Sequence, residues 1–240
     1  MGSPIEQFTI QRLIHLQLGG LDLSFTNSAL CMLIAVVLSV ALLTLSVRKR
    51  ALVPGRWQSV SELLYEFTAG TIRESAGTDG LKYFPFIFTL FLFLIFGNAI
   101  GIIPFSFTFT SHIIVTFALA VVVFIGVTIL GFAIHGLHYF RMFLPDGSPI
   151  AAAPLLILVE FVSYLSRPFS LAMRLAINMT VGHIILYLCG SFMVLLGLLG
   201  VFPGLFLAAL IVLEMFVALL QAYVFTMLTC VYLSDALHMH

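Results

Sequence analysis

Five stretches of the chain are almost continuously apolar and at least 20 residues long. A helix needs about 20 mostly apolar residues to cross a hydrocarbon layer about 30 Å thick, because each residue adds about 1.5 Å. We therefore predict five membrane-spanning helices, at residues 28–47, 83–103, 113–135, 151–197 and 201–237. The last two stretches exceed a perpendicular crossing, so these helices must tilt strongly or project beyond the bilayer.

Charged and apolar residues alternate with helical spacing between the first two stretches, at residues 57–81. Glu62 and Glu66, for example, are followed directly by Leu63 and Phe67. This pattern predicts an amphipathic helix that lies in the membrane interface, with a solvated loop as the alternative.

Composition places the whole chain, residues 1–240, in a single membrane domain. It is 62% hydrophobic and 8% charged, against about 25% charged in soluble domains. The net charge of zero provides no basic field for nucleic acid. Cys31, Cys189 and Cys230 are isolated from one another, and spacings typical of metal, phosphate-loop or nucleophile sites are absent. We expect an all-α polytopic membrane protein without a metal, a cofactor, a nucleic-acid partner or catalysis of its own.

The distribution of cations predicts the orientation, because Lys and Arg are retained on the cytoplasmic or matrix side. In a five-span arrangement Arg12 lies alone on one side. The cations on the other side are Arg48, Lys49, Arg50, Arg56, Arg73, Lys82 and Arg141. The amino terminus is therefore predicted outside and the carboxyl terminus inside.

The fourth span contains polar residues that are costly in lipid. They are Glu160, Arg167, Arg174, Asn178 and His183. An arginine at mid-bilayer costs about 2.5–3.5 kcal/mol on insertion scales, so it needs a partner or a wet cavity. Arg167 could snorkel to the membrane surface, whereas Arg174 lies about 10 Å further along the helix. Arg174 is thus the stronger functional candidate.

Helical periodicity arranges these residues on faces. At about 100° per residue, the first four fall within about 40° of one another, whereas His183 faces the opposite way. Glu214, Gln221 and Asp235 form a similar row in the fifth span. If a turn near residues 197–204 makes the two helices an antiparallel hairpin, residues at equal depth have numbers that sum to about 397. The pairs predicted at equal depth are His183 with Glu214, Arg174 with Gln221, and Glu160 with Asp235. His183 should face Glu214, whereas Arg174 points the other way and faces a different partner.

Such a set of residues can move protons. Histidine and glutamate bind and release protons, whereas arginine keeps its proton because its pKa exceeds about 12. His183 and Glu214 would form one half-path, Glu160 and Asp235 a second, and Arg174 a cationic barrier between them. The mobile carboxylate that connects the half-paths must come from a partner. A proton-coupled secondary transporter and a structural scaffold remain alternatives, although the chain lacks the internal repeats of many transporters.

Four segments resemble subunit a of F-type ATP synthase, and the resemblance covers nearly the whole chain. The segments are Glu160 through RLAINMTVGH (174–183), LE (213–214) through QAYVFT (221–226), NAIGIIP (98–104) and SPIEQF (3–8).

The resemblance implies a role for each candidate. Arg174 would face a ring of c subunits and release protons from their membrane carboxylate. His183 and Glu214 would line the outer half-channel, with Gln221 and Asn178 near the arginine. Glu160 would line the inner half-channel.

The resemblance also implies partners and a location. The partners are the c-ring, b-type peripheral-stalk subunits and the remaining ATP synthase subunits, and the chain itself would be a non-catalytic subunit. The His183 and Glu214 arrangement resembles the mitochondrial and alphaproteobacterial pattern. We expect an energy-coupling membrane, with a bacterial inner membrane favoured over a mitochondrial one.

Overall fold

The computed structural model describes residues 9–14, 17–18, 21–22, 24–48, 54–102, 107–136, 138–139 and 153–238. Within them the α-helices are α1 (Asn27–Val47), α2 (Arg56–Ala76), α3 (Phe84–Ile102), α4 (Ile113–His135), α5 (Ala153–Leu195) and α6 (Val201–Leu237). Three short 3₁₀ helices join them, η2 (Asp79–Tyr83), η3 (Phe109–Ser111) and η5 (Gly197–Gly200). Strand β1 (Arg12–Ile14) pairs with β4 (Phe25–Thr26), and β2 (Gln17–Leu18) pairs with β3 (Leu21–Asp22).

Within the described residues, five helical segments are long and apolar enough to cross a membrane, namely α1, η2 with α3, α4, α5 and α6. The prediction of an all-α polytopic membrane protein is therefore confirmed. The four strands, which the hydrophobic pattern does not predict, contain only two or three residues each.

The amphipathic segment is shorter than predicted. Helix α2 ends at Ala76 rather than near residue 81, because Gly77 adopts a φ of +66° and donates its N–H to the carbonyl of Arg73. This left-handed backbone is favourable for glycine and ends the helix. Helix η2 then leads the chain into α3.

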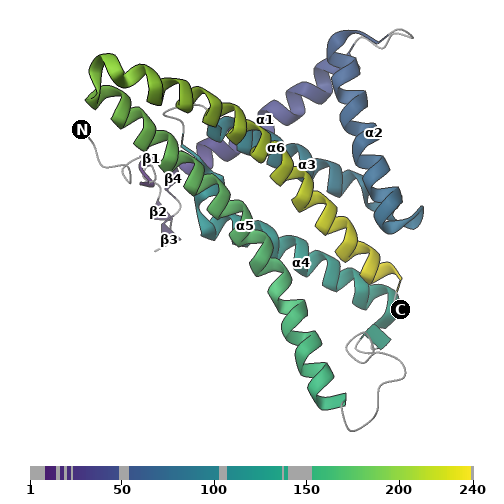
Figure 1. The fold of residues 1–240 in the computed structure, drawn as a ribbon. Coiled ribbons are helices and arrows are strands. Elements are labelled where there is room, and N and C mark those ends of the chain that lie inside the picture. The colour runs from purple at the N-terminus through teal and green to yellow at the C-terminus, as the bar shows by residue number, and fades with distance from the viewer. Residues whose placement is uncertain are drawn as a thin grey trace.

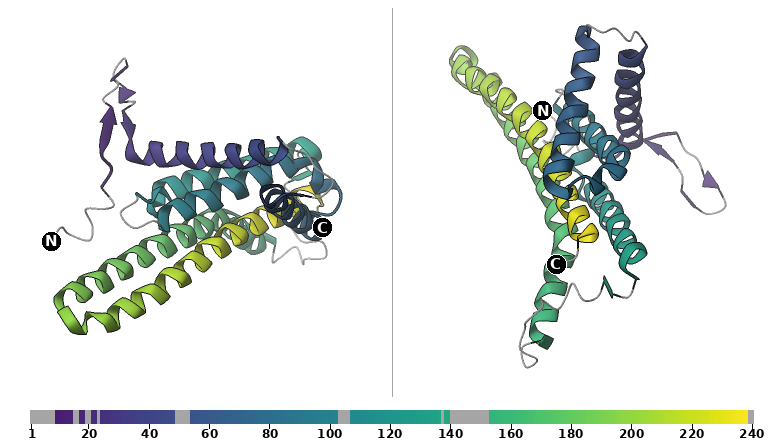
Figure 2. Two further views of the ribbon diagram at one scale, coloured as in Figure 1. Left: turned by 90° about the horizontal axis from the view of Figure 1, so that it is seen from above. Right: turned by 90° about the vertical axis from the view of Figure 1, so that its right-hand side faces the viewer.

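Helices α5 and α6 form the long antiparallel hairpin that the sequence predicts (Figures 1 and 2). Gly197, with a φ of +56°, and Gly200 form the turn, and a Cβ on Gly200 would clash with the carbonyl of Met193. Figure 1 also shows α5 changing direction part-way along its length. Pro168 lies inside this helix and accounts for the bend, because proline removes one backbone hydrogen bond.

The main core lies where α3, α4, α5 and α6 meet. Leu94, Val123, Leu175 and Phe225 are buried there, one from each helix. Small side chains such as Ala172 on α5 and Ala222 on α6 are fully buried and allow close approach of helix backbones. This packing fixes which face of α5 points inward and which points outward.

Candidate functional site

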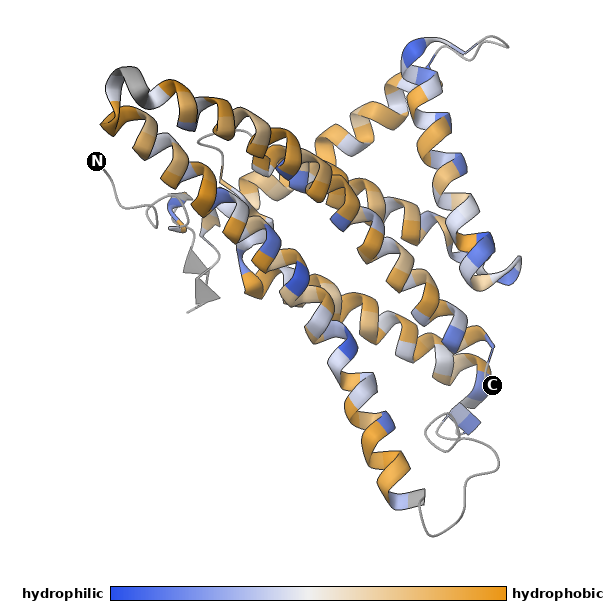
Figure 3. Cartoon of the chain, in the orientation of Figure 1, coloured by the Kyte–Doolittle hydropathy of each residue, from blue (hydrophilic) through white to orange (hydrophobic). Residues whose placement is uncertain are grey.

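Arg174 lies on the outward face of α5. Its side chain is exposed, as are those of Ile177 and Val181 on the next two turns. Among the residues that the structure describes, Arg174 has neither a hydrogen bond nor an ion pair. Figure 3, coloured by hydropathy, shows α5 and α6 as mostly hydrophobic helices with a few hydrophilic positions along them. A permanent cation thus lies on the exposed face of a helix that is long and apolar enough to cross a membrane.

His183 is buried on another face of the same helix. Its Nε2 lies 2.7 Å from the hydroxyl of Thr108, in the segment that leads into η3. Thr108 also donates a hydrogen bond to the carbonyl of Gly101, at 3.2 Å. Because the Thr108 hydrogen points to the Gly101 carbonyl, the Thr108 hydroxyl oxygen can accept a hydrogen bond from the imidazole N–H of His183. Sequence reasoning missed Thr108, because a threonine in an interhelical turn carries no distinguishing pattern.

Glu214 places a buried carboxylate beside α5. Neither of its oxygens has a hydrogen-bond partner within the described residues. A Cβ built on Gly182 would lie 2.5 Å from Oε1, so the carboxyl group lies directly against this glycine. Glu214 therefore lies within one residue of the depth predicted for it, because Gly182 is next to His183. His183 itself is hydrogen-bonded to Thr108 rather than to Glu214. A buried carboxyl group without a hydrogen bond from the described residues is costly, so it needs compensation from another group.

A cavity of about 210 Å³ opens between the two long helices at this level. Glu214 and Asn178 supply its polar lining. The remaining lining residues are Ile177, Val181, Gly182, Ile185, Leu186, Leu210, Leu213 and Val217. The space is sufficient for several water molecules. Both carboxylate oxygens of Glu214 are nevertheless buried, so the cavity lies beside the carboxyl group without exposing it.

Gln221 is buried between α5 and α6. It is 1% exposed, and its Oε1 accepts a hydrogen bond from Asn178 Nδ2 at 3.1 Å. Gln221 thus contacts Asn178, one turn from Arg174, whereas Arg174 faces outward, as expected for a residue with a different partner. Asn98 of α3 adds a third amide by donating to the carbonyl of Ala218, at 3.1 Å.

The predicted pairing of Glu160 with Asp235 is wrong. Asp235 accepts a hydrogen bond from Arg167 Nη1 at 2.8 Å, forming an ion pair. Opposite charges attract, and the long arginine side chain spans the difference in depth. Glu160 is half-buried and has no hydrogen bond or ion pair in the described part of the chain.

The register between the helices shifts along the hairpin. Glu214 and Asp235 are 21 residues apart on α6. The residues that they contact on α5, Gly182 and Arg167, are only 15 residues apart. The prediction that residues at equal depth have a constant sum of residue numbers assumes two straight antiparallel helices whose side chains are short. The bend at Pro168 and the reach of Arg167 both violate this assumption.

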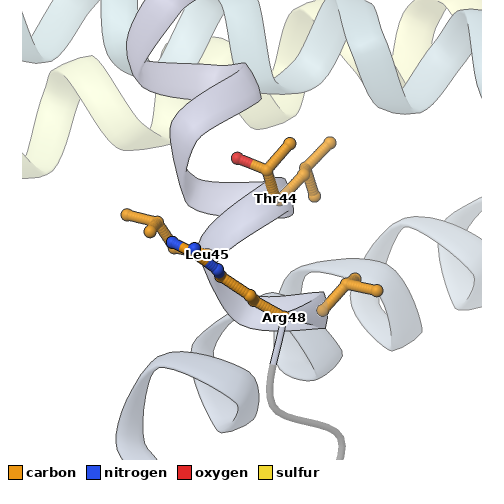
Figure 4. A pocket seen from close by; sticks show the side chains of 5 residues that line it. Thr44, Leu45 and Arg48 are labelled. Carbon is orange, nitrogen blue, oxygen red and sulfur yellow. The ribbon is translucent and has the colours of Figure 1, made fainter.

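A hollow of about 650 Å³ at the C-terminal end of α1 lies outside this arrangement (Figure 4). Its lining includes Thr44, Leu45 and Arg48. Thr44 donates to the carbonyl of Val40 within its own helix, and the lining contains none of the predicted site residues. It therefore adds no chemistry to the polar row on α5 and α6.

Comparison with known proteins identifies the family. A family model described as ATP synthase A chain matches residues 29–234. The chain belongs to this family, subunit a of F-type ATP synthase. Two similar proteins, both named ATP synthase subunit a, come from Paramagnetospirillum magneticum, with 59% identity over 247 positions, and Rhodospirillum rubrum, with 57% over 241. Each alignment covers all of both chains. A third subunit a, from Parvibaculum lavamentivorans, is 50% identical over 98% of this chain and 94% of its own. The resemblance inferred from the sequence is thereby confirmed, and the chain is a multi-pass membrane protein of this family.

Gly182 provides a test of the Glu214 position in this subunit a. We expect Gly182→Ala to displace the carboxylate, because the new methyl group would lie 2.5 Å from Oε1. ATP-driven proton pumping by vesicles containing the assembled complex should fall roughly tenfold, since a shift of about 1 Å can cost far more at a reacting group. Gly190→Ala is the matched control, because a Cβ there meets nothing within 4 Å. Equal rates in the two variants would contradict the placement.

Proposed function

We propose that this chain conducts protons across the membrane in F-type ATP synthase, along two offset half-channels separated by Arg174, and so couples the proton gradient to ATP synthesis. The observation that carries the proposal is the separation of a cation on the exposed face of α5 from titratable groups buried on α5 and α6. Arg174 is exposed without an anion from the described residues, whereas His183 and Glu214 are buried behind it. Two proton-binding groups and a permanent cation on different faces are what an interrupted proton path requires.

The outer half-channel uses His183 and Glu214. The cavity beside Glu214 has room for water near the carboxyl group, and the hydrogen bond between His183 Nε2 and the Thr108 hydroxyl orients the imidazole. Asn178 and Gln221 lie between this level and Arg174, where their hydrogen-bonded amides can solvate a proton-carrying group without holding a charge. The inner half-channel uses Glu160, which is half-buried on the far side of Arg174.

The missing carboxylate belongs to a ring of c subunits that contacts the exposed face of α5 and α6. Arg174 attracts this carboxylate in its ionised form, so each arriving group must release its proton before it passes. The exposed apolar residues around Arg174 favour such a membrane-embedded partner. The b-type peripheral-stalk subunits and the other ATP synthase subunits complete the assembly.

The same proposal includes an orientation. The carboxyl terminus lies on the side that retains Lys and Arg, and the amino terminus lies outside. The bacterial sources of the similar proteins support a bacterial inner membrane as the location.

Disulfide crosslinking tests the ring contact. We expect Ile177→Cys and Val181→Cys to form disulfides with cysteines placed beside the c-subunit carboxylate, because both positions are 47% exposed on the Arg174 face. Native Cys31, Cys189 and Cys230 are first replaced by alanine. Crosslinked products are measured on denaturing gels of oxidised membranes.

Val37→Cys on α1 is the matched control, since Val37 is exposed to a similar extent, 56%, on a different helix. It should give no product with the ring. Crosslinks from α1 with none from α5 would overturn the proposed interface. Movement of a solute by the purified chain alone would favour a secondary transporter instead.

A further inference from the structure

A charged cluster joins α5 to the C-terminal part of α6. The guanidinium of Arg167 bonds to Asp235 at 2.8 Å. It also lies over two aromatic rings, at 5.4 Å from the centroid of Tyr164 and 5.2 Å from that of Tyr232. Arginine is commonly held by such combined ionic and cation–π contacts. The sequence pattern does not predict this arrangement, and conduction by the half-channels does not require it.

The position of the guanidinium matters because of Glu160. Arg167 and Glu160 are seven residues apart, which places them on the same face of α5 with about two turns between them. Helical side chains lean toward the N-terminus of their helix, and the Tyr164 contact shows that the guanidinium has already moved one turn in that direction. About one further turn separates it from Glu160.

We propose that Asp235 is a positioning residue that holds Arg167 away from Glu160 and neutralises its charge, so that Glu160 stays free to exchange protons. The inference rests on the proposed function, in which Glu160 belongs to the inner half-channel. Arg167 released from Asp235 would pair with the Glu160 carboxylate. A carboxylate held in an ion pair neither accepts nor passes protons readily.

Neighbouring groups support the fixed position of Arg167. The Tyr164 hydroxyl lies 2.6 Å from Thr128 Oγ1 and 3.1 Å from the Tyr139 hydroxyl, so the ring beneath the guanidinium is held from α4 and from the segment after it. Burial, followed by the Tyr164 hydrogen bond, raises the pKa of Tyr139, which therefore stays neutral.

The other charged or titratable neighbours do not compete with Asp235. His135 approaches the carbonyl of Ala236, at 3.2 Å, rather than the carboxylate of Asp235. Arg174 stands two turns further along α5 and is itself a cation. Within the described residues, Asp235 is the anion that Arg167 meets.

Charge-neutralising variants of the complete ATP synthase test the proposal. ATP-driven proton pumping into native membrane vesicles is measured with a pH-sensitive dye and normalised to assembled complex. Asp235→Asn should lower the rate about tenfold, because the released Arg167 would pair with the Glu160 carboxylate at contact distance and hold it ionised. Arg167→Gln, and Arg167→Gln combined with Asp235→Asn, should remain within about twofold of wild type.

This asymmetry distinguishes positioning from a simple structural clamp. A clamp between α5 and α6 loses its bond in all three variants, so equal losses would overturn the inference. Asp235→Asn should also add nothing to Glu160→Gln, because both act through Glu160. If the complex with Asp235→Asn does not assemble, the pumping rate of Arg167→Gln alone tests the proposal. A tenfold lower rate in that variant would reject it. Normal pumping by Glu160→Gln and Arg174→Gln would instead show that the proposed function itself is wrong.

Discussion

Replacing Arg174 with glutamine should abolish ATP synthesis driven by a proton gradient, lowering the rate at least about 100-fold. A cation and a carboxylate about 4 Å apart attract each other by about 4 kcal/mol at an effective dielectric constant of about 20. Without this attraction the ring carboxylate can pass the barrier still protonated, and protons can move between the half-channels without turning the ring. The measurement is ATP synthesis by energised vesicles, with passive proton conduction recorded in parallel.

Arg167→Gln is the matched control for this experiment. It removes a cation from the same face of α5 two turns away, yet should leave synthesis within about twofold of wild type. Both complexes should assemble, since Arg174 is exposed and bonds to none of the described residues. Wild-type synthesis by the Arg174 variant would remove the central element of the proposed mechanism.

The helices were predictable because lipid imposes a simple rule on the sequence. Any segment that crosses the bilayer must be apolar over about 20 residues and must satisfy its own backbone, which favours a helix. Long apolar stretches therefore mark α5 and α6 without further information. The end of α2 was not predictable in this way, because it depends on the positive φ of Gly77 rather than on hydropathy.

The candidate residues were predictable for the same reason, but their contacts were not. Arg174 and Glu214 are conspicuous in a sequence because charges in apolar helices are costly. Helical periodicity correctly separates the faces of Arg174 and His183. Their partners depend on side-chain reach and on turn conformation. Arg167 extends to Asp235, and Thr108 reaches His183 from a segment without a periodic pattern.

The Arg167 and Asp235 pair illustrates this limit most clearly. By depth alone Asp235 could face either Glu160 or Arg167, and index sums favour Glu160. Charge reverses the choice, because two carboxylates repel whereas a guanidinium and a carboxylate attract. Once the pair is known, Asp235 is better interpreted as a counter-ion than as a proton carrier, which leaves Glu160 as the carboxylate of the proposed inner half-channel.

Glu214→Gln should lower proton pumping at least about 100-fold, because a positioned proton-transfer group typically contributes 100-fold or more. Glutamine has nearly the same shape but cannot carry the proton. The fold should persist, since neither carboxylate oxygen bonds to a described residue. The substitution therefore breaks no hydrogen bond or ion pair with those residues. Glu66→Gln on the exposed face of α2 is the matched control, and Glu214→Asp should retain part of the activity. Normal pumping by Glu214→Gln would show that the outer half-channel uses side chains other than Glu214, which borders the cavity between α5 and α6.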